Sequence, residues 1–163
     1  GEDPKFIVRR MMVCASEDVG NADPQALQVA VAASLAVERL GMPEARITLA
    51  QAAAYIATAP KSNSSINAID EAMQTVNETG NLPIPAHLQD AHYKSAGKLG
   101  HGIGYKYAHD YPNHYVEQQY LPYELSGTQF YRPSENGYEV KIRDHMDFLK
   151  DHAKNEKDGG ARA

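Results

Sequence analysis

Helix start and stop signals divide residues 1–80 into short segments. Asp3-Pro4 and Asp23-Pro24 each place an aspartate before a proline. The aspartate oxygen can accept amides that the first helical turn leaves unpaired, and a proline at the first position has no amide to satisfy. Each segment is followed by a residue that ends a helix, either a glycine or a proline: Gly20, Gly41, Pro60 and Gly80. These signals predict four helices, over residues 4–19, 24–40, 43–57 and 62–79.

The apolar residues of these segments predict an up-and-down helical core. The second segment is apolar on two faces, one with Leu27, Val31 and Leu35 and another with Val29, Ala33, Ala36 and Leu40. A helix that is apolar on nearly all sides is usually buried among other helices. Fourteen alanines lie within residues 1–60, and such small side chains let helices approach closely. The fourth segment adds a stripe at helical spacing, formed by Ile66, Ile69, Met73 and Val76.

The second half of the chain has a different character. Nine of the ten tyrosines lie between Tyr93 and Tyr138, and prolines and glycines recur from residue 83 to residue 122, so long regular elements are not expected there. We predict a short helix near 91–99 and a small hairpin that pairs 115–120 with 128–131. After Pro133, Ser134 can cap a last helix whose stripe packs on the core through Tyr138, Ile142, Met146 and Leu149.

The organisation that we expect is therefore mainly α, in three parts. Residues 1–80 form a helical body, residues 81–150 form an irregular appendage that ends in the last helix, and residues 151–163 form a frayed tail. The single cysteine, Cys14, cannot form an internal disulfide and is interpreted as a small buried hydrophobe. The sequence has no apolar run long enough to span a membrane and no leader, which predicts a soluble, cytosolic piece of a longer protein with no membrane partner.

No catalytic template fits the sequence. Gly97-Lys98 precedes a leucine and Lys61-Ser62 follows a proline, so neither matches the Gly-Lys-Ser/Thr loop that binds phosphate. The glycines from Gly100 to Gly104 lack the spacing of a dinucleotide-binding turn. Four histidines lie close together, but none are at helical i, i+4 spacing: His92, His101, His109 and His114. We expect no catalytic residue, cofactor or metal in this chain, and an enzyme built on the histidine-rich segment is the alternative.

Residues 91–109 are the candidate nucleic-acid contact. They hold three lysines, three histidines and three tyrosines and no acidic residue. Lysines can neutralise phosphates and tyrosines can stack on bases. The candidate residues are Lys94, Lys98, Tyr105, Lys106 and Tyr107. In the alternative interpretation these tyrosines seal an irregular layer onto the helical core, and the formal charge of −5 argues against the chain as a whole binding nucleic acid strongly.

Three blocks of the sequence resemble a known family. They are Ala15–Pro24 (ASEDVGNADP), Ala59–Asn63 (APKSN) and His101–Pro112 (HGIGYKYAHDYP), the last followed by Gln118–Pro122 (QQYLP). In this order they are similar to the C-terminal part of the replication-associated recombination protein A family, also called maintenance of genome stability protein A. Its members are clamp-loader-like AAA+ ATPases. The resemblance runs from Gly1 to about Leu149, with departures at Gln89, where a basic residue is expected, and at Asn113-His114, which replaces a glycine-containing turn.

The resemblance implies a collar-like helical oligomerisation domain that is itself non-catalytic and forms tetramers. ATP and magnesium would bind in the ATPase part, which lies N-terminal to this segment. The whole protein would be a DNA-dependent ATPase of the bacterial cytoplasm and nucleoid that maintains replication forks and acts in recombination. Its implied partners are its own copies, DNA, and replication or single-strand-binding proteins. Arg9 and Arg10 are candidates for relaying nucleotide state between subunits, with a surface salt bridge as the alternative, and a DNA-binding module over residues 91–109 is the alternative function.

Overall fold

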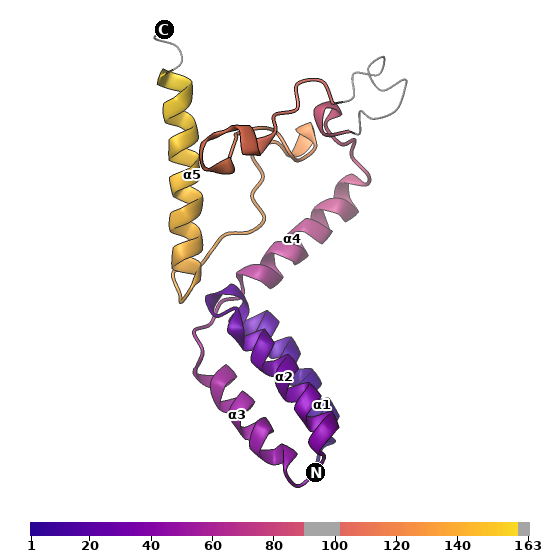
Figure 1. Cartoon of the computed structure of the whole chain (residues 1–163). Helices are drawn as coiled ribbons and strands as arrows, with labels where there is room; N and C mark the ends of the chain where they lie inside the picture. The colour runs from indigo at the N-terminus through magenta and orange to yellow at the C-terminus, as the bar shows by residue number, and fades with distance from the viewer. Residues whose placement is uncertain (90–101, 160–163) are drawn as a thin grey trace. The chain divides into compact units, whose positions relative to one another are not determined.

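The structure, a computed structural model, describes residues 1–89 and 102–159. Within these ranges it has five α-helices and no strand, which confirms the mainly α prediction (Figure 1). The helices are α1 (Pro4–Cys14), α2 (Gln25–Leu40), α3 (Ala45–Thr58), α4 (Ser64–Thr79) and α5 (Glu139–Gly159). The chain divides into two units, one of residues 1–73 and 130–143, the other of residues 74–129 and 144 onward. The segment 130–143 is in the same unit as α1, α2 and α3, and the expected boundaries at residues 80 and 150 stay predictions.

The start and stop signals work as predicted. Asp3 Oδ1 accepts the Lys5 amide at 2.9 Å at the start of α1, and Asp23 Oδ1 accepts the Gln25 amide at 3.0 Å at the start of α2. The three glycines that were expected to end helices all have positive φ, namely Gly20, Gly41 and Gly80. A π-helical turn, Ala15–Val19, continues α1 up to Gly20, so the helical backbone covers the predicted range.

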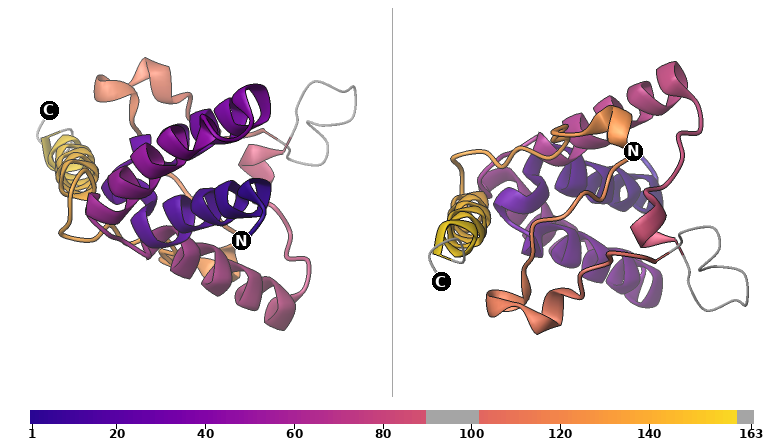
Figure 2. Two further views of the ribbon diagram at one scale, coloured as in Figure 1. Left: turned by 90° about the horizontal axis from the view of Figure 1, so that it is seen from below. Right: turned by 90° about the horizontal axis from the view of Figure 1, so that it is seen from above.

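Helices α1, α2 and α3 lie side by side and form a three-helix body (Figure 2). Alanine dominates the buried residues of this body, as in the inward face of α2 with Ala26, Ala30 and Ala33. The Tyr55 hydroxyl of α3 donates to Asp23 Oδ2 at 2.8 Å, which ties α3 to the start of α2. Lys61 Nζ donates to the carbonyls of Ile56, Ala57 and Ala59, so that a cation satisfies the last carbonyls of α3.

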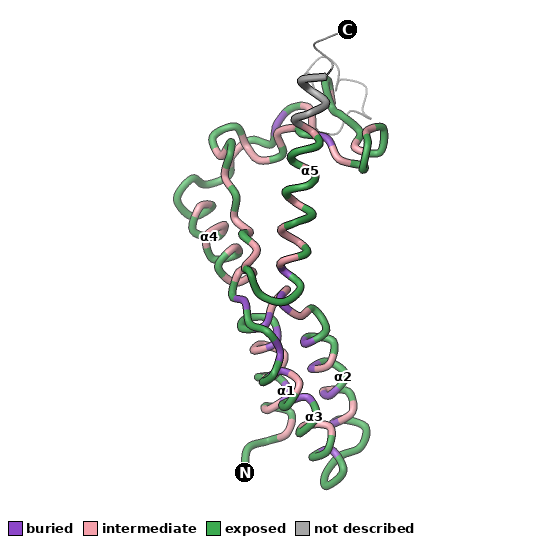
Figure 3. The backbone as a smooth tube through the Cα atoms, turned by 90° about the vertical axis from the view of Figure 1, so that its left-hand side faces the viewer, coloured by how far each residue is buried: buried purple, intermediate pink, exposed green. Residues whose placement is uncertain are grey.

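The structure differs from the prediction at α2 and α4. Leu27, Val31 and Leu35 face outward from α2, because the alanine face allows the close approach of the neighbouring helices and takes the inner side. Helix α4 buries no residue, and its apolar stripe is more than half exposed at Ile69, Met73 and Val76 (Figure 3). The expected core of four helices is therefore a core of three, with two apolar helix faces left uncovered.

Three expectations for the second half also need correction. Residues 115–120 and 128–131 are not strands, because strand-favouring residues form a ladder only against a partner strand. Here the Gln119 carbonyl is bonded to the His87 ring, and the Gln118 side chain is bonded to the Lys106 carbonyl. The last helix begins at Glu139, because Ser134 forms a local turn with the Asn136 amide before Gly137 takes a positive φ. Helix α5 then continues to Gly159, past residue 151. The predicted helix at 91–99 lies outside the described residues.

Candidate interaction surfaces

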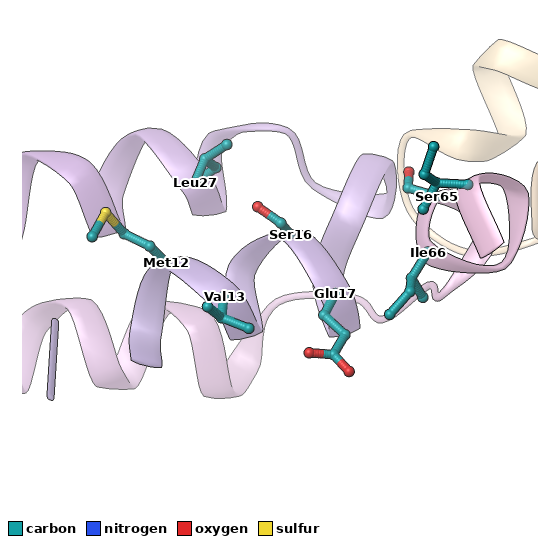
Figure 4. Close-up of a pocket in the computed structure, with 8 residues that line it drawn as sticks. Met12, Val13, Ser16, Glu17, Leu27, Ser65 and Ile66 are labelled. Atoms are coloured by element: carbon teal, nitrogen blue, oxygen red, sulfur yellow. The ribbon is translucent and has the colours of Figure 1, made fainter. Parts of the chain in front are cut away.

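An apolar groove runs between α1, α2 and the first turns of α4, all within the first unit. Its volume is about 510 Å³. Figure 4 shows side chains of α1, the following π turn, α2 and α4 that line it. The lining residues are Met12, Val13, Ser16, Glu17, Leu27, Ser65, Ile66 and Ile69, of which Glu17 alone is charged. We call this the α2–α4 groove; Leu27 places it at one end of the exposed stripe of α2.

A second groove, also of about 510 Å³, lies between α1 and α3. Phe6, Ile7, Met11 and Ile56 give it an apolar floor, and Arg10 and Lys61 are among its charged lining residues. Both arginines are exposed; Arg10 lines this groove and Arg9 does not. Both arginines stay predictions as relay residues.

The third feature is a buried carboxylate, Glu139, at the start of α5. Its Oε2 accepts the Ser62 hydroxyl at 2.6 Å and the Ser134 amide at 2.7 Å, and its Oε1 accepts the Tyr131 hydroxyl at 2.8 Å. Asn21 Nδ2 in turn donates to the Tyr131 hydroxyl at 3.2 Å. We call these groups the Glu139 junction. It joins the loop before α4, the segment 131–134 and the turn after α1 through one charge.

The electrostatics of the Glu139 junction favour the ionised carboxylate. Burial of Glu139 by itself raises its pKa, but hydrogen bonds from Ser134, Ser62 and Tyr131 outweigh this effect and lower the pKa below its ordinary value of 4.5. The donors stabilise the charge because they already point at the oxygens in the folded chain. The unfolded chain has no such arrangement.

We expect the Glu139 junction to make the folded chain sensitive to acid. Since the pKa of Glu139 is lowered on folding, its contribution to the free energy of unfolding is complete above pH 4.5 and is lost as the pH falls through the lower, folded-state pKa. Urea unfolding of wild type and Glu139→Gln at pH values above and below 4.5 measures this contribution. The stability difference between the two proteins should shrink on acidification, and a difference that does not change with pH would contradict it.

In the second unit, one side-chain amide holds the segment that contains Tyr105, Lys106 and Tyr107. Gln118 Nε2 donates to the Lys106 carbonyl at 2.9 Å and to the Tyr120 hydroxyl at 3.0 Å, and Gln118 Oε1 accepts the Lys106 amide at 3.3 Å. The three predicted residues are exposed. Lys94 and Lys98 lie outside the described residues, so the five-residue contact stays a prediction.

A run of aromatic rings begins in this segment, at Tyr107. The ring centroids of Tyr107 and His109 are 5.1 Å apart, and those of His109 and His114 are 4.9 Å apart. We call these three rings the aromatic ladder. Among the described residues, no group of three or more His, Cys, Asp or Glu side chains could hold a metal ion, and no described helix is long and apolar enough to cross a membrane.

Comparison with known proteins decides the family. A family model described as "MgsA AAA+ ATPase C terminal" matches residues 1–150. This chain belongs to the MgsA C-terminal family. The resemblance of the sequence blocks is thereby confirmed.

Relatives of this MgsA domain are much longer than the chain itself. An uncharacterized AAA domain-containing protein of Mycobacterium tuberculosis is 51% identical over 92% of the chain and 33% of its own length. The replication-associated recombination protein A of Bacillus subtilis is 50% identical over 90% of the chain and 35% of its own length. The protein of that name in Escherichia coli K12 is 40% identical over 95% of the chain and 35% of its own length. The chain thus spans about a third of these relatives.

The sequence pattern of this MgsA domain did not predict the Glu139 junction. Glu139 precedes an apolar stripe and reads as one of several charged residues off that stripe, so nothing in the pattern separates it from the exposed Lys141. The available signal was the set of hydroxyl residues in two loops, Ser62, Ser64, Tyr131 and Ser134, which can satisfy a buried carboxylate. The uncovered groove was also missed, because α4 was expected to pack in the core.

Proposed function

We propose that this chain is the assembly domain of an MgsA-type AAA+ ATPase, through which copies of the chain associate into a tetramer. The observation that carries the proposal is the uncovered apolar surface of the first unit, formed by the α2–α4 groove with the exposed stripe of α2. The chain itself performs no chemistry in this proposal.

The composition of this surface supports association over solvent exposure. Leu27, Val31 and Leu35 continue the lining of the groove along α2, and Ile69 and Met73 extend it along α4. Contiguous apolar surface of this kind commonly marks a protein interface. A second copy is the occupant we propose, because each copy carries both a groove and an apolar helix ridge. A ridge that enters the groove of the next copy forms a head-to-tail interface, which can close into a ring of four.

Sedimentation equilibrium over a wide range of concentrations tests the proposal with two matched variants. Ile69→Glu places a carboxylate in the groove, on a helix that buries no residue, so folding should be unaffected. Burial of an unpaired charge in an apolar interface costs on the order of 3 kcal/mol, which weakens association about 100-fold. Ile47→Glu is the control, because Ile47 is also an exposed apolar residue of the first unit but does not line the groove.

Three results would contradict the assembly proposal. The first is a wild-type chain that stays monomeric at every concentration. The second is an Ile69→Glu variant that associates as tightly as wild type, and the third is an Ile47→Glu variant that loses association to the same degree as Ile69→Glu.

For the longer protein we propose the activity that its relatives' names suggest. It would be a DNA-dependent ATPase of the bacterial cytoplasm and nucleoid that acts in replication-associated recombination, with ATP and magnesium bound outside the present chain. Its partners would be DNA and replication or single-strand-binding proteins. ATP hydrolysis by the longer protein, with and without DNA, tests this proposal. Hydrolysis that DNA does not stimulate would contradict it.

A further inference from the structure

We propose that the aromatic ladder of the second unit, Tyr107, His109 and His114, is a stacking site for the bases of single-stranded nucleic acid. The proposal goes beyond assembly and involves residues outside the α2–α4 groove. It also differs from the sequence prediction of a contact over residues 91–109, because it adds His114 and rests on ring geometry.

The three rings are in contact with one another and yet exposed. Centroid distances of 5.1 Å and 4.9 Å place each ring against the next. Tyr107 is 53% exposed, and His109 and His114 are also exposed. Aromatic rings in an irregular segment normally gain most by covering a core, so a set that packs on itself in solvent leaves ring surface for a ligand.

The backbone is held in an unfavourable conformation where it presents the last ring. Asn113 has φ +55° and His114 has φ +53°, two consecutive residues in the left-handed region that are not glycine. Side chains rarely adopt this region, and such residues concentrate at functional sites. The turn is supported from below, since Pro112, Asn113 and Tyr115 line a small cavity with Leu149, His152 and Ala153 of α5. The strained turn thereby sets His114 against His109.

The Tyr107 end of the aromatic ladder is also held in place. The Gln118 side chain bonds both backbone groups of Lys106, the residue before Tyr107, and also the Tyr120 hydroxyl. Tyr107 is therefore placed without a helix or strand of its own. A site that is ordered before binding loses less entropy when the ligand arrives.

The residue types favour a nucleic acid as the ligand. Tyrosine and histidine rings are the side chains on which unpaired bases stack, and such stacking tolerates any base because each has a π face. Lys106 lies beside the ladder and can meet a phosphate, while Asp110 is the single carboxylate within residues 102–116. Double-stranded nucleic acid hides its base faces, so a single strand is the ligand class that fits.

Fluorescence anisotropy with labelled oligo(dT) at low salt tests the site in the whole chain. Tyr107→Ala and His114→Ala should each weaken binding about 5-fold or more, the factor expected for one lost base stack. Tyr107→Phe keeps a ring and should bind like wild type. Tyr123→Ala is the matched control, because Tyr123 is 65% exposed in the same unit but is not a ladder residue. An abasic oligonucleotide of the same length, which keeps the phosphates, should bind at least 5-fold more weakly than oligo(dT).

Several outcomes would overturn the proposal. They are an absence of oligo(dT) binding, equal binding of the abasic strand, and an equal loss in Tyr123→Ala and Tyr107→Ala. Thermal unfolding shows that a variant is folded, and sedimentation shows that its assembly is unchanged. A variant that loses oligo(dT) binding but associates normally separates the ladder from the α2–α4 groove.

Discussion

Gly137→Ala is expected to destabilise the chain by about 3 kcal/mol or more, the sum of backbone strain and overpacking. Gly137 has φ +55°, a conformation that costs alanine about 1–2 kcal/mol. An added Cβ would lie 2.1 Å from the Ala22 carbonyl oxygen and 2.7 Å from Pro60 Cγ. Neither neighbour is the end of a flexible side chain, so the backbone must move, and the hydrogen bond from the Tyr138 amide to the Ala22 carbonyl, 2.7 Å long, is lost.

Thermal unfolding measures this effect against a matched control. A loss of about 3 kcal/mol lowers the melting temperature of a chain of this size by about 10 °C. Gly80→Ala is the control, because Gly80 has φ +68° but nothing within 4 Å of an added Cβ. It should cost about 1 kcal/mol from backbone strain alone. Equal effects at the two glycines would mean that the contact with Ala22 and Pro60 is not rigid.

Glu139→Ala is expected to cost about 3 kcal/mol, because it leaves buried donors without an acceptor. The Ser134 amide and the Tyr131 hydroxyl both donate to this carboxylate. Ser62 loses its 2.6 Å bond as well, although its hydroxyl keeps Ser64 as a neighbour. The junction then no longer ties the start of α5 to the loop before α4.

Two further variants make the test of Glu139 sharp. Glu139→Gln keeps the shape and one carbonyl acceptor for Ser62 and Ser134, so its loss at neutral pH should be smaller than that of alanine. Glu135→Ala is the exposed control, since the Glu135 side chain is 88% exposed and pairs with Arg143 on the surface. Surface pairs of this kind contribute about 0–1 kcal/mol. If urea unfolding shows that Glu135→Ala and Glu139→Ala lower the free energy of unfolding equally, the role of the junction is contradicted.

Local signals made the helices of the first half predictable from sequence. The Asp-Pro pairs and the glycines act on the residues next to them, so their effect does not depend on the rest of the fold. The start of α1 at Pro4 and the end of α2 at Leu40 follow from such signals. The resemblance of three sequence blocks likewise pointed to the family that the comparison shows.

The failures concern packing, which local signals do not determine. Leu27 and Ala30 are both apolar residues of α2, and a sequence pattern does not say which of two apolar faces a neighbour will cover. Helix α4 has the stripe of a core helix, but the same stripe serves an interface with another chain. The predicted hairpin was wrong because Tyr115 and its neighbours form a strand only where a partner strand exists.

Because the core of the three-helix body is made mostly of alanines, enlarging a core residue should destabilise it more than shortening one. In most domains the severe core change is truncation, which leaves a cavity. Here Ala26 and Ala30 are fully buried between neighbouring helices and have almost nothing to truncate. Any enlargement at these positions must push the helices apart. In a library of variants of this domain, the buried alanine positions should therefore accept only small residues. The exposed apolar residues of α2 can be shortened without loss of folding.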